Sequence, residues 1–437
     1  MNQVVNVCEK MQIFEYPNKG DWSEILVRPN KDAAELGSIV KDVLDDIKVN
    51  GDAAVKKYEL KFDHVSLDTL LVTKDEMEEA DLLVSDELKH ALRLAHSNIE
   101  RFHSAQVFTG KVVETQPGVK CWQKAVPIEK VGLYVPGGTA PLFSTVLMLA
   151  TPARIAGCKE IILCSPPDKC GKINPAILVA AKIAGVDKIY KVGGVQAIGA
   201  MAYGTESVTK VYKIFGPGNQ YVTAAKQQVS LKDVAIDMPA GPSEVMVVVD
   251  ESANPAFVAS DLLSQAEHGI DSQSIMVTTC KEMIDGVLKE LDLQLSNLPR
   301  REILKESLAH CKLILVNDNE VVDMINEYAP EHLILSTANY MDLAERVVNA
   351  GSVFLGNYSC ESAGDYASGT NHTLPTNGYA KAYSGVSLDS FIRKITFQEL
   401  SAEGVRNIGS TVEVMAENEQ LLAHKNAMTL RLATVVD

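Results

Sequence analysis

Short apolar strands and helices alternate from Lys130 onward, and this alternation constrains the fold more than any other feature of the chain. Strands are expected at residues 131–135, 161–164, 188–192 and 213–215, with helices at 144–156, 175–185, 196–203 and 221–229. The connecting loops are short, and several carry glycine directly after a strand. The pattern predicts a parallel sheet with helices on both faces, and ligands at the carboxyl ends of its strands.

A second unit of the same kind begins after Ser243. Its expected strands are residues 244–249, 274–279, 312–316, 333–335 and 352–355. Because 437 residues are too many for one simple core, we expect at least two domains. Earlier helices are predicted at 32–49, 52–62 and 85–103, with Phe102 on the buried face of the last one and His90, His96 and His103 at the surface.

Composition excludes several classes of protein. A net charge of −16 argues against nucleic acid or an anionic membrane as partner. No secretory signal and no apolar run long enough to span a membrane are visible. The eight cysteines are scattered without a C-x-x-C pair, which is typical of reduced thiols in a cytoplasmic protein.

Residues 356–378 lack the periodicity found elsewhere. This stretch holds Glu361, Asp365 and His372, with three glycines around them, at positions 356, 364 and 369. A non-periodic segment of this length in a compact domain is usually functional or disordered. Its composition is unlike that of disordered segments, so we predict an ordered active-site loop.

Two other places carry candidate chemistry. Asp261, Gln265 and His268 share one face of a helix predicted at 254–269, which indicates a metal site or simply a polar face. Glu331 and His332 stand where a helix gives way to a buried strand, as a general acid–base pair or as a salt-bridged surface turn. The residues alone leave both alternatives open.

The usual signatures of cofactor binding and hydrolysis are absent. There is no G-x-G-x-x-G, which leaves a nucleotide cofactor undecided, and neither G-x-S-x-G nor H-E-x-x-H occurs. Cys121 and Cys158 have no electropositive setting and are interpreted as inert thiols.

Eight ordered segments together resemble the histidinol dehydrogenase family. They are VGLYVPGGTAPLFSTVLMLATPARIAGC (131–158), KVGGVQAIGAMAYGTESV (191–208), KIFGPGNQYVTAAK (213–226), AIDMPAGPSEV (235–245), SDLLSQAEHG (260–269), YAPEHLIL (328–335), SCESAGDYASGTNHTLPT (359–376) and LLAHKNAMTLRL (421–432). The resemblance implies an α/β fold with two incomplete Rossmann-like parallel-sheet domains and small N- and C-terminal helical segments.

The resemblance also guides the domain boundaries. We expect an N-terminal extension at residues 1–30 and a first α/β domain, with the metal and substrate site, formed by 31–130 plus 243–385. The second α/β domain, on the NAD side, covers 131–242. Residues 386–437 form a helical tail that is swapped between the subunits of a homodimer and contributes to the partner's site.

The implied metal is one Zn²⁺ per subunit. Its ligands would be the residues matching Gln265, His268 and Asp365, with His424 supplied by the other subunit. A glutamine ligand lies outside the usual zinc set and would not follow from spacing. Mn²⁺ or Co²⁺ could substitute for zinc.

The implied activity is the last step of histidine biosynthesis. L-histidinol is oxidised through L-histidinaldehyde to L-histidine with two NAD⁺. His332 would be the base in the hydride steps, and Glu331 would activate water. The residues matching substrate contacts are Ser243, Gln265, His268, His332, Asp365, Glu419 and His424, and those matching NAD contacts are Tyr134, Gln196 and Asn219. Glu361 and His372 lie in the substrate loop without an assigned role.

Other functions remain to be separated from this one. A relative that uses zinc and NAD could oxidise another small polar alcohol, such as a sulfonated diol; Glu419 favours histidinol because it would contact the substrate's amine. A zinc hydrolase without NAD would use Glu331 as base on water. A non-catalytic metal-binding scaffold would bind metal without turnover.

Overall fold

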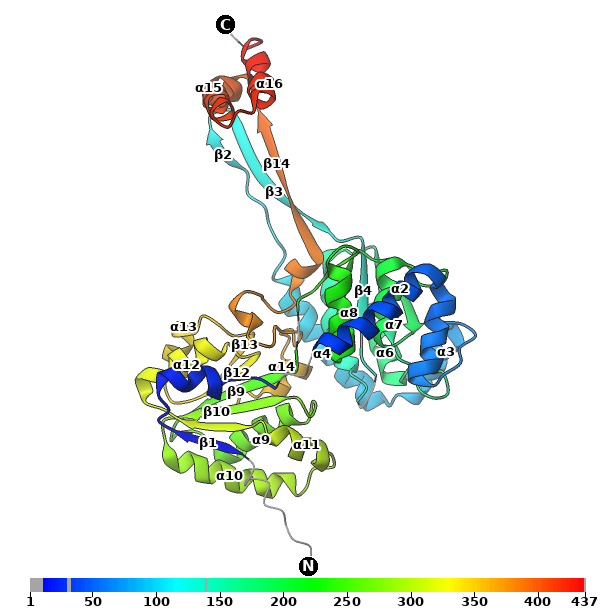
Figure 1. Cartoon of the computed structure of the whole chain (residues 1–437), viewed down its shortest axis with the longest axis vertical. Helices are drawn as coiled ribbons and strands as arrows, with labels where there is room; N and C mark the ends of the chain where they lie inside the picture. The colour runs from blue at the N-terminus through cyan, green and yellow to red at the C-terminus, as the bar shows by residue number, and fades with distance from the viewer. Residues whose placement is uncertain (1–10, 30–32, 138–139, 240, 436–437) are drawn as a thin grey trace, which may run out of the picture.

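The computed structural model describes residues 11–29, 33–137, 140–239 and 241–435. Two lobes, each built on a parallel sheet, lie side by side, and a long arm projects away from them (Figure 1). This architecture confirms the predicted α/β fold with two parallel-sheet units.

The first lobe contains a six-stranded sheet in the order β1-β11-β10-β9-β12-β13, with every pair parallel. Its strands are β1 (Gln12–Glu15), β9 (Glu244–Val249), β10 (Gln273–Thr278), β11 (Lys312–Leu315), β12 (His332–Ser336) and β13 (Ser352–Leu355). Side chains alternate between its faces, as a strand requires. Val245 and Val247 pack with α9 (Pro255–Ala266), α10 (Lys281–Leu295) and α11 (Arg301–Leu308), whereas Met246 packs with α12 (Val321–Tyr328) and α13 (Tyr340–Arg346).

The second lobe contains a five-stranded parallel sheet in the order β6-β5-β4-β7-β8. Its strands are β4 (Lys130–Tyr134), β5 (Glu160–Ser165), β6 (Lys188–Lys191), β7 (Lys213–Phe215) and β8 (Ala235–Ile236). One face packs with α3 (Lys74–Leu83), α4 (Asp86–Ser104), α5 (Phe143–Ala156) and α6 (Pro175–Ala184). The other face packs with α2 (Ala33–Tyr58), α7 (Gly194–Tyr203) and α8 (Gln220–Ser230).

Three N-terminal helices differ from the expected domain assignment. Residues 31–130 were expected to belong with 243–385, but α2, α3 and α4 pack on the five-stranded sheet. Strand β1, expected in a separate extension, is the edge strand of the six-stranded sheet. Periodicity shows that a helix has an apolar face, but it does not show which of two sheets that face will cover.

Helix boundaries near the N-terminus are close to those expected. Gly51 breaks α2 with a positive φ of 51°, as its position after Asn50 predicted. Ser85 caps α4 through its side chain. The prediction for the far end of α4 is wrong: His103 is fully buried, and its Nδ1 lies 2.8 Å from the Ile99 carbonyl oxygen, whereas Phe102 is 46% exposed.

The arm is an antiparallel ribbon that carries two helices at its tip. Strands β2 (Val113–Gln116), β3 (Val119–Pro127) and β14 (Ile392–Leu400) form the ribbon, and β14 pairs with β3 over its whole length. Helices α15 (Ala402–Asn418) and α16 (Leu422–Leu432) pack against each other at the tip (Figure 1).

Residues 386–437 were expected to be a helical tail, and this is wrong for Ile392–Leu400, which form strand β14. Its hydrogen-bonding partner, β3, lies far away in the sequence, and pairing overrides local preference. The rest of the tail is helical as expected, in two segments, because α15 ends at Asn418 and α16 begins at Leu422.

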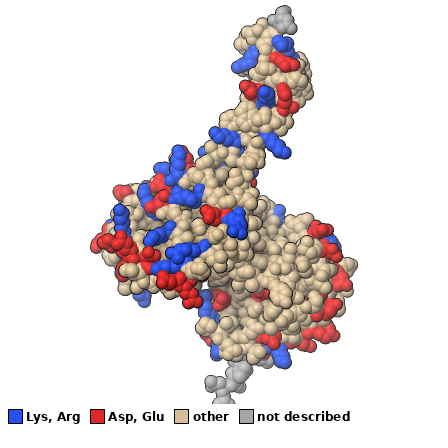
Figure 2. All heavy atoms as spheres, turned by 180° about the vertical axis from the view of Figure 1, so that it is seen from behind, with Lys and Arg blue, Asp and Glu red and all other residues tan. Residues whose placement is uncertain are grey.

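Charged side chains of both signs are found on the surface. Figure 2 shows basic side chains interspersed with acidic ones on both lobes and at the tip of the arm. None of the helices in the described ranges is long and apolar enough to cross a membrane.

Candidate active site

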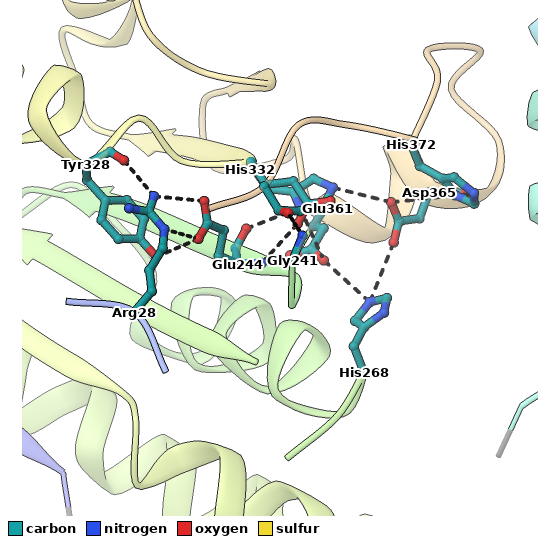
Figure 3. A network of polar contacts seen from close by, with 11 residues as sticks. Arg28, Gly241, Glu244, His268, Tyr328, His332, Glu361, Asp365 and His372 are labelled. Carbon is teal, nitrogen blue, oxygen red and sulfur yellow. Dashed lines mark hydrogen bonds and ion pairs between the residues drawn. The ribbon is translucent and has the colours of Figure 1, made fainter. Parts of the chain in front are cut away.

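A cluster of imidazoles and carboxylates lies at the amino ends of β9 and β12 in the six-stranded sheet (Figure 3). His332 is the first residue of β12, and Glu331 precedes it. Gln265 lies in the last turn of α9 and His268 just beyond it. The short helix α14 (Glu361–Tyr366) lies opposite, in the segment predicted to be an active-site loop.

Three acidic side chains surround the His332 ring. Its Nδ1 lies 3.7 Å from Glu331 Oε2 and 3.9 Å from Glu361 Oε1, and its Nε2 lies 3.7 Å from Asp365 Oδ1. His268 Nε2 is 3.7 Å from Glu361 Oε1 and 3.9 Å from Asp365 Oδ2. These contacts place two imidazoles against one shared group of carboxylates.

The cluster is largely withdrawn from water. Glu331, His332 and Glu361 are 5%, 3% and 1% exposed. The alternative that Glu331 and His332 form a salt-bridged surface turn is therefore wrong.

Burial and charge move the pKa values in opposite directions. Burial raises the pKa of Glu331 to about 8 and also raises that of Glu361. Burial by itself would lower the pKa of His332, but the carboxylates of Glu361, Glu331 and Asp365 raise it to about 10. Burial opposes ionisation of Asp365, yet the neighbouring imidazoles hold its pKa below the usual value. Protons on these groups would therefore balance part of the cluster's negative charge.

A second layer of polar contacts fixes the amino ends of the two strands. The Glu244 N–H donates to Glu331 Oε2 at 2.9 Å. The Glu244 carboxylate accepts from Arg28 Nη2 at 2.9 Å and from the Tyr328 hydroxyl at 3.3 Å, and Arg28 Nη2 also donates to the Tyr328 carbonyl oxygen at 2.6 Å (Figure 3). The N-terminal segment therefore locks the position of Glu331 through Glu244.

A cation fits the donor set. Among the described residues, His268, Glu361 and Asp365 offer ligand atoms that all lie within 4.8 Å of one another. Glu361 Oε2 and His332 Nε2 are buried and have no hydrogen-bond partner within the described part of the chain. Nitrogen and carboxylate oxygen ligands are those that zinc prefers.

Gln265 fits the same group. It is fully buried, and its surroundings suit an amide whose Nε2 donates to the Glu244 carbonyl oxygen and to Glu361 Oε1, both at 3.2 Å. The reversed amide would point Oε1 at these two acceptors, an arrangement that a cation between them would stabilise.

His372 links the cluster to the other lobe. Its Nδ1 lies 2.9 Å from the Asp365 carbonyl oxygen, and its Nε2 lies 3.1 Å from Thr145 Oγ1 on α5. The neighbouring Asn371 donates to the Met148 carbonyl oxygen at 2.6 Å, also on α5. Because α5 follows the carboxyl end of β4, the cluster faces the carboxyl end of the five-stranded sheet.

The residues predicted to contact NAD lie at that carboxyl end. Tyr134 ends β4, Gln196 lies in the first turn of α7 after β6, and Asn219 caps α8 after β7. Strands β5 and β6 extend from one side of β4, and β7 and β8 from the other. The order in which the strands are added therefore reverses between β4 and β7. Open α/β sheets bind ligands at such a reversal, outside the carboxyl ends of the strands.

The other predicted site residues divide into two groups. Ser243 is half-buried just before β9, and its carbonyl oxygen accepts the Gln273 N–H at 3.2 Å, so it lies at the same end as the cluster. Glu419 and His424 are exposed in the arm, far from their own chain's cluster (Figure 1).

Sequence reasoning missed some members of the site. Glu361 was named without a role, although its four-residue spacing from Asp365 places both on one side of α14. Arg28 and Glu244 were not singled out. The charged residue that opens the otherwise apolar strand EVMVVV was the available signal for Glu244.

Comparisons with known proteins identify the family to which the chain belongs. The family model described as histidinol dehydrogenase matches residues 26–432. The chain belongs to the histidinol dehydrogenase family. Histidinol dehydrogenase from Bacteroides thetaiotaomicron is 65% identical over 426 residues, which covers 97% of this chain and all of that protein. Histidinol dehydrogenase from Escherichia coli K12 is 53% identical, and the alignment covers 94% of each chain.

A solved structure agrees with the fold. The crystal structure of histidinol dehydrogenase from Elizabethkingia anophelis matches with a TM-score of 0.95 and 54% identity, over 98% of this chain and 99% of that one. The family's name denotes an oxidoreductase.

Proposed function

We propose that this chain oxidises L-histidinol to L-histidine through L-histidinaldehyde, using two NAD⁺, as the last step of histidine biosynthesis. The observation that carries the proposal is the cluster of His268, Glu331, His332, Glu361 and Asp365 facing a parallel sheet's carboxyl end, in a chain that matches histidinol dehydrogenases along nearly its whole length. Free thiols are compatible with a cytoplasmic enzyme, and the structure has them at Cys121, Cys158, Cys164, Cys170, Cys280 and Cys360.

Gln265, His268 and Asp365 would hold one Zn²⁺, together with His424 of the partner subunit. When bound, the metal would supply a positive charge that orients the substrate, and NAD⁺ would accept the electrons. Glu361 contacts both His268 and His332, so it would fix the orientation of the two imidazoles.

His332 would remove the proton from the substrate's hydroxyl group. Its pKa is raised by the three surrounding carboxylates. A cation that neutralises these carboxylates would return His332 to the range where it can act as a base. The Phe354 ring, 6.1 Å away between centroids, packs beside the imidazole and limits access of water.

Glu331 would activate the water that adds to the aldehyde. One of its oxygens is held by the Glu244 N–H, which leaves the other oxygen to accept a proton. Because burial raises its pKa to about 8, Glu331 is a stronger base than an exposed glutamate.

The substrate would extend toward Ser243 and toward Glu419 of the partner subunit. Glu419 and His424 are exposed at the tip of the arm, where another copy of the chain can reach them. Tyr134, Gln196 and Asn219 would contact NAD⁺ at the carboxyl end of the facing sheet.

The first experiment measures NADH formed per L-histidinol consumed, with purified protein, Zn²⁺ and NAD⁺. A ratio of about two supports a four-electron oxidation, and loss of NADH formation on adding a chelator supports a metal requirement. The Glu331→Gln variant should lower the ratio toward about one, because histidinaldehyde would leave before it is hydrated. A wild-type ratio near one would contradict the proposed hydration step, and no NADH at all would contradict the substrate.

Subunit mixing tests the shared site. Asp365→Asn and His424→Ala proteins should each be nearly inactive. After unfolding and refolding together, half of the dimers would carry one copy of each and one intact site, so about a quarter of wild-type activity should return. Failure to recover activity would contradict a site built from two chains.

A further inference from the structure

The five-stranded lobe contains a buried acid that the proposed chemistry does not use. Glu59 opens a single turn of π-helix, η3 (Glu59–Asp63), and is fully buried. Its Oε1 accepts the Gly193 N–H at 2.9 Å and Gln196 Nε2 at 2.8 Å. Turns of this kind are rare and occur often at functional sites.

Gln196 is held by two carboxylates. Besides Glu59, its Nε2 donates to Asp63 Oδ2 at 3.0 Å, so both amide hydrogens are engaged. Its Oε1 is buried without a hydrogen-bond partner in the described part of the chain. A buried acceptor left unpaired is unfavourable, and it marks a position where an arriving donor would gain the full value of the bond.

The surrounding turn is fixed in the same way. The Gly194 N–H donates to the Tyr134 hydroxyl at 3.1 Å. Gly194 has a φ of +52°, and a Cβ built there would lie 3.0 Å from Gln196 Oε1. The unpaired oxygen therefore lies against the glycine turn at the carboxyl ends of β4 and β6, where the dinucleotide is proposed to bind.

We infer that Glu59 is a positioning residue for the dinucleotide: it fixes the amide of Gln196 so that Oε1, and not Nε2, is presented to a hydrogen-bond donor of NAD⁺. That donor would be a ribose hydroxyl or the carboxamide N–H, which share this chemistry. The inference rests on the proposed function, because it assumes that NAD⁺ binds at this end of the sheet.

The choice of glutamate follows from the contacts. An apolar side chain at position 59 would leave the Gly193 N–H without its acceptor and would allow the Gln196 amide to rotate. Burial raises the pKa of Glu59 to about 7, partly opposed by the Gly193 N–H. Oε2 is buried without a hydrogen-bond partner in the described part of the chain, and a proton on it still leaves Oε1 as an acceptor, so the arrangement persists on both sides of neutral pH.

Two substitutions of Glu59 distinguish the loss of its hydrogen-bond acceptor from the loss of its negative charge. Glu59→Met keeps the length of the side chain but removes the acceptor, whereas Glu59→Gln keeps an oxygen at the Oε1 position. For Glu59→Met we expect the KM for NAD⁺ and the Kd for NADH to rise about tenfold, which corresponds to the loss of one hydrogen bond. The value of kcat, the KM for histidinol and the zinc content should stay within about twofold of wild type. Glu59→Gln should stay within about twofold of wild type in every quantity.

A double variant tests whether Glu59 acts through Gln196. Gln196→Met should raise the Kd for NADH by a similar factor, and Glu59→Met combined with Gln196→Met should be no weaker than Gln196→Met alone. Additive losses would overturn the inference, as would an unchanged Kd in Glu59→Met or an equal loss in Glu59→Gln. If Glu59→Met does not fold, Glu59→Asp withdraws the carboxylate from both donors and should still raise the Kd; no change would overturn the inference.

The wild-type protein separates the two proposals. If wild type neither binds NADH nor reduces NAD⁺, the proposed function itself is contradicted. If wild type does both and Glu59→Met does so equally well, only the role of Glu59 is contradicted.

Discussion

The two parallel sheets have the same architecture, yet their candidate ligand sites lie at opposite ends. In the six-stranded sheet, the imidazole–carboxylate cluster gathers at the amino ends of β9 and β12. In the five-stranded sheet, the residues proposed to contact NAD lie at the carboxyl ends of β4, β6 and β7. The Thr145–His372 contact brings these two ends together.

Helix direction explains why the two ends suit different ligands. The carboxyl end of α9, with its partial negative charge, points at the cluster through Gln265 and favours a cation. The amino ends of α7 and α8, with partial positive charge, lie at the carboxyl end of the other sheet and favour anionic or electron-rich groups. Placing the amino end of one sheet against the carboxyl end of another would thus join the proposed metal site to the proposed dinucleotide site.

The strongest test of this comparison separates the two sites. Asp365→Asn removes a negative charge that faces two imidazoles, so zinc content should fall. The value of kcat should drop by more than about 100-fold, which exceeds the usual loss when a residue that only hydrogen-bonds to a metal ligand is changed. Binding of NADH, measured by fluorescence titration, should stay within about twofold. Asp342→Asn, an exposed change in the same lobe, is the control. Joint loss of zinc and NADH binding would contradict two separable sites.

A second test concerns the buried ion pair behind the cluster. Arg28→Met leaves the Glu244 carboxylate, 2% exposed, without its partner, and should lower the free energy of unfolding by about 3 kcal/mol in urea titrations. Lys281→Met removes an exposed ion pair and should leave the free energy of unfolding nearly unchanged. Equal effects of the two substitutions would show that Glu244 is not held as tightly as its burial indicates.

The five-stranded lobe also contains a buried ion pair, which can be compared with that of Arg28 and Glu244. Lys226 and Asp237 lie 2.5 Å apart and are 5% and 1% exposed, and Lys226 also donates to the Gly216 carbonyl oxygen at 2.7 Å. If the lobes unfold separately, Arg28→Met and Lys226→Met should shift different transitions. A single transition shifted by both would show that the lobes unfold as one unit.

A third test uses pH. Burial raises the pKa of Asp261, on the helix that carries Gln265, to about 7, above its value of about 3.9 in an unfolded chain. Its stabilising contribution is therefore complete below about pH 3.9 and is lost as pH rises through 7. Asp261→Asn should gain about 2 kcal/mol relative to wild type between pH 5 and pH 8 in thermal unfolding. The exposed control, Asp285→Asn, should show no such gain, and a pH-independent difference for Asp261→Asn would contradict the shift.

The smallest effect on function is expected at Gly216, which follows β7 in the five-stranded sheet. Gly216 has a φ of +125°, and an added Cβ would meet the Tyr134 carbonyl oxygen at 2.0 Å. Gly216→Ala should therefore distort the backbone directly after β7, where it lies against the end of β4, and weaken NADH binding about tenfold, with zinc content unchanged. Gly20→Ala, with open space around it, should change neither quantity. Loss of zinc in Gly216→Ala would show that the two ends are more tightly coupled than their separate elements indicate.

Strand and helix positions in both lobes were predictable because apolar runs and glycine turns mark them locally. Strand β9 and helix α9, for example, begin within a residue of their predicted starts. The assignment of α2, α3 and α4 to a lobe was not predictable, because an apolar face fits either sheet. Strand β14 was read as helix because its partner, β3, lies far along the chain.

The candidate site was partly visible in the sequence for a related reason. Asp365, His332 and Glu331 stand out as polar groups beside apolar strands or in a non-periodic segment. The contact between Arg28 and Glu244 joins segments that no spacing rule connects. The buried state of His103 depends on Asn371, whose Nδ2 lies 3.4 Å from its Nε2, and not on its own helix alone.

The pairing of β3 with β14 also matters while the chain is being made. Strand β3 leaves the ribosome long before Ile392 is synthesised, and at ordinary elongation rates this interval is on the order of tens of seconds. Throughout that interval the edge of β3 that will receive β14 is unpaired and open to other growing chains. Lys120 and Lys124 lie along the strand, and charged residues of this kind discourage pairing with the wrong strand. The arm is thus the last part of the molecule to be completed, and its lysines protect the nascent chain until then.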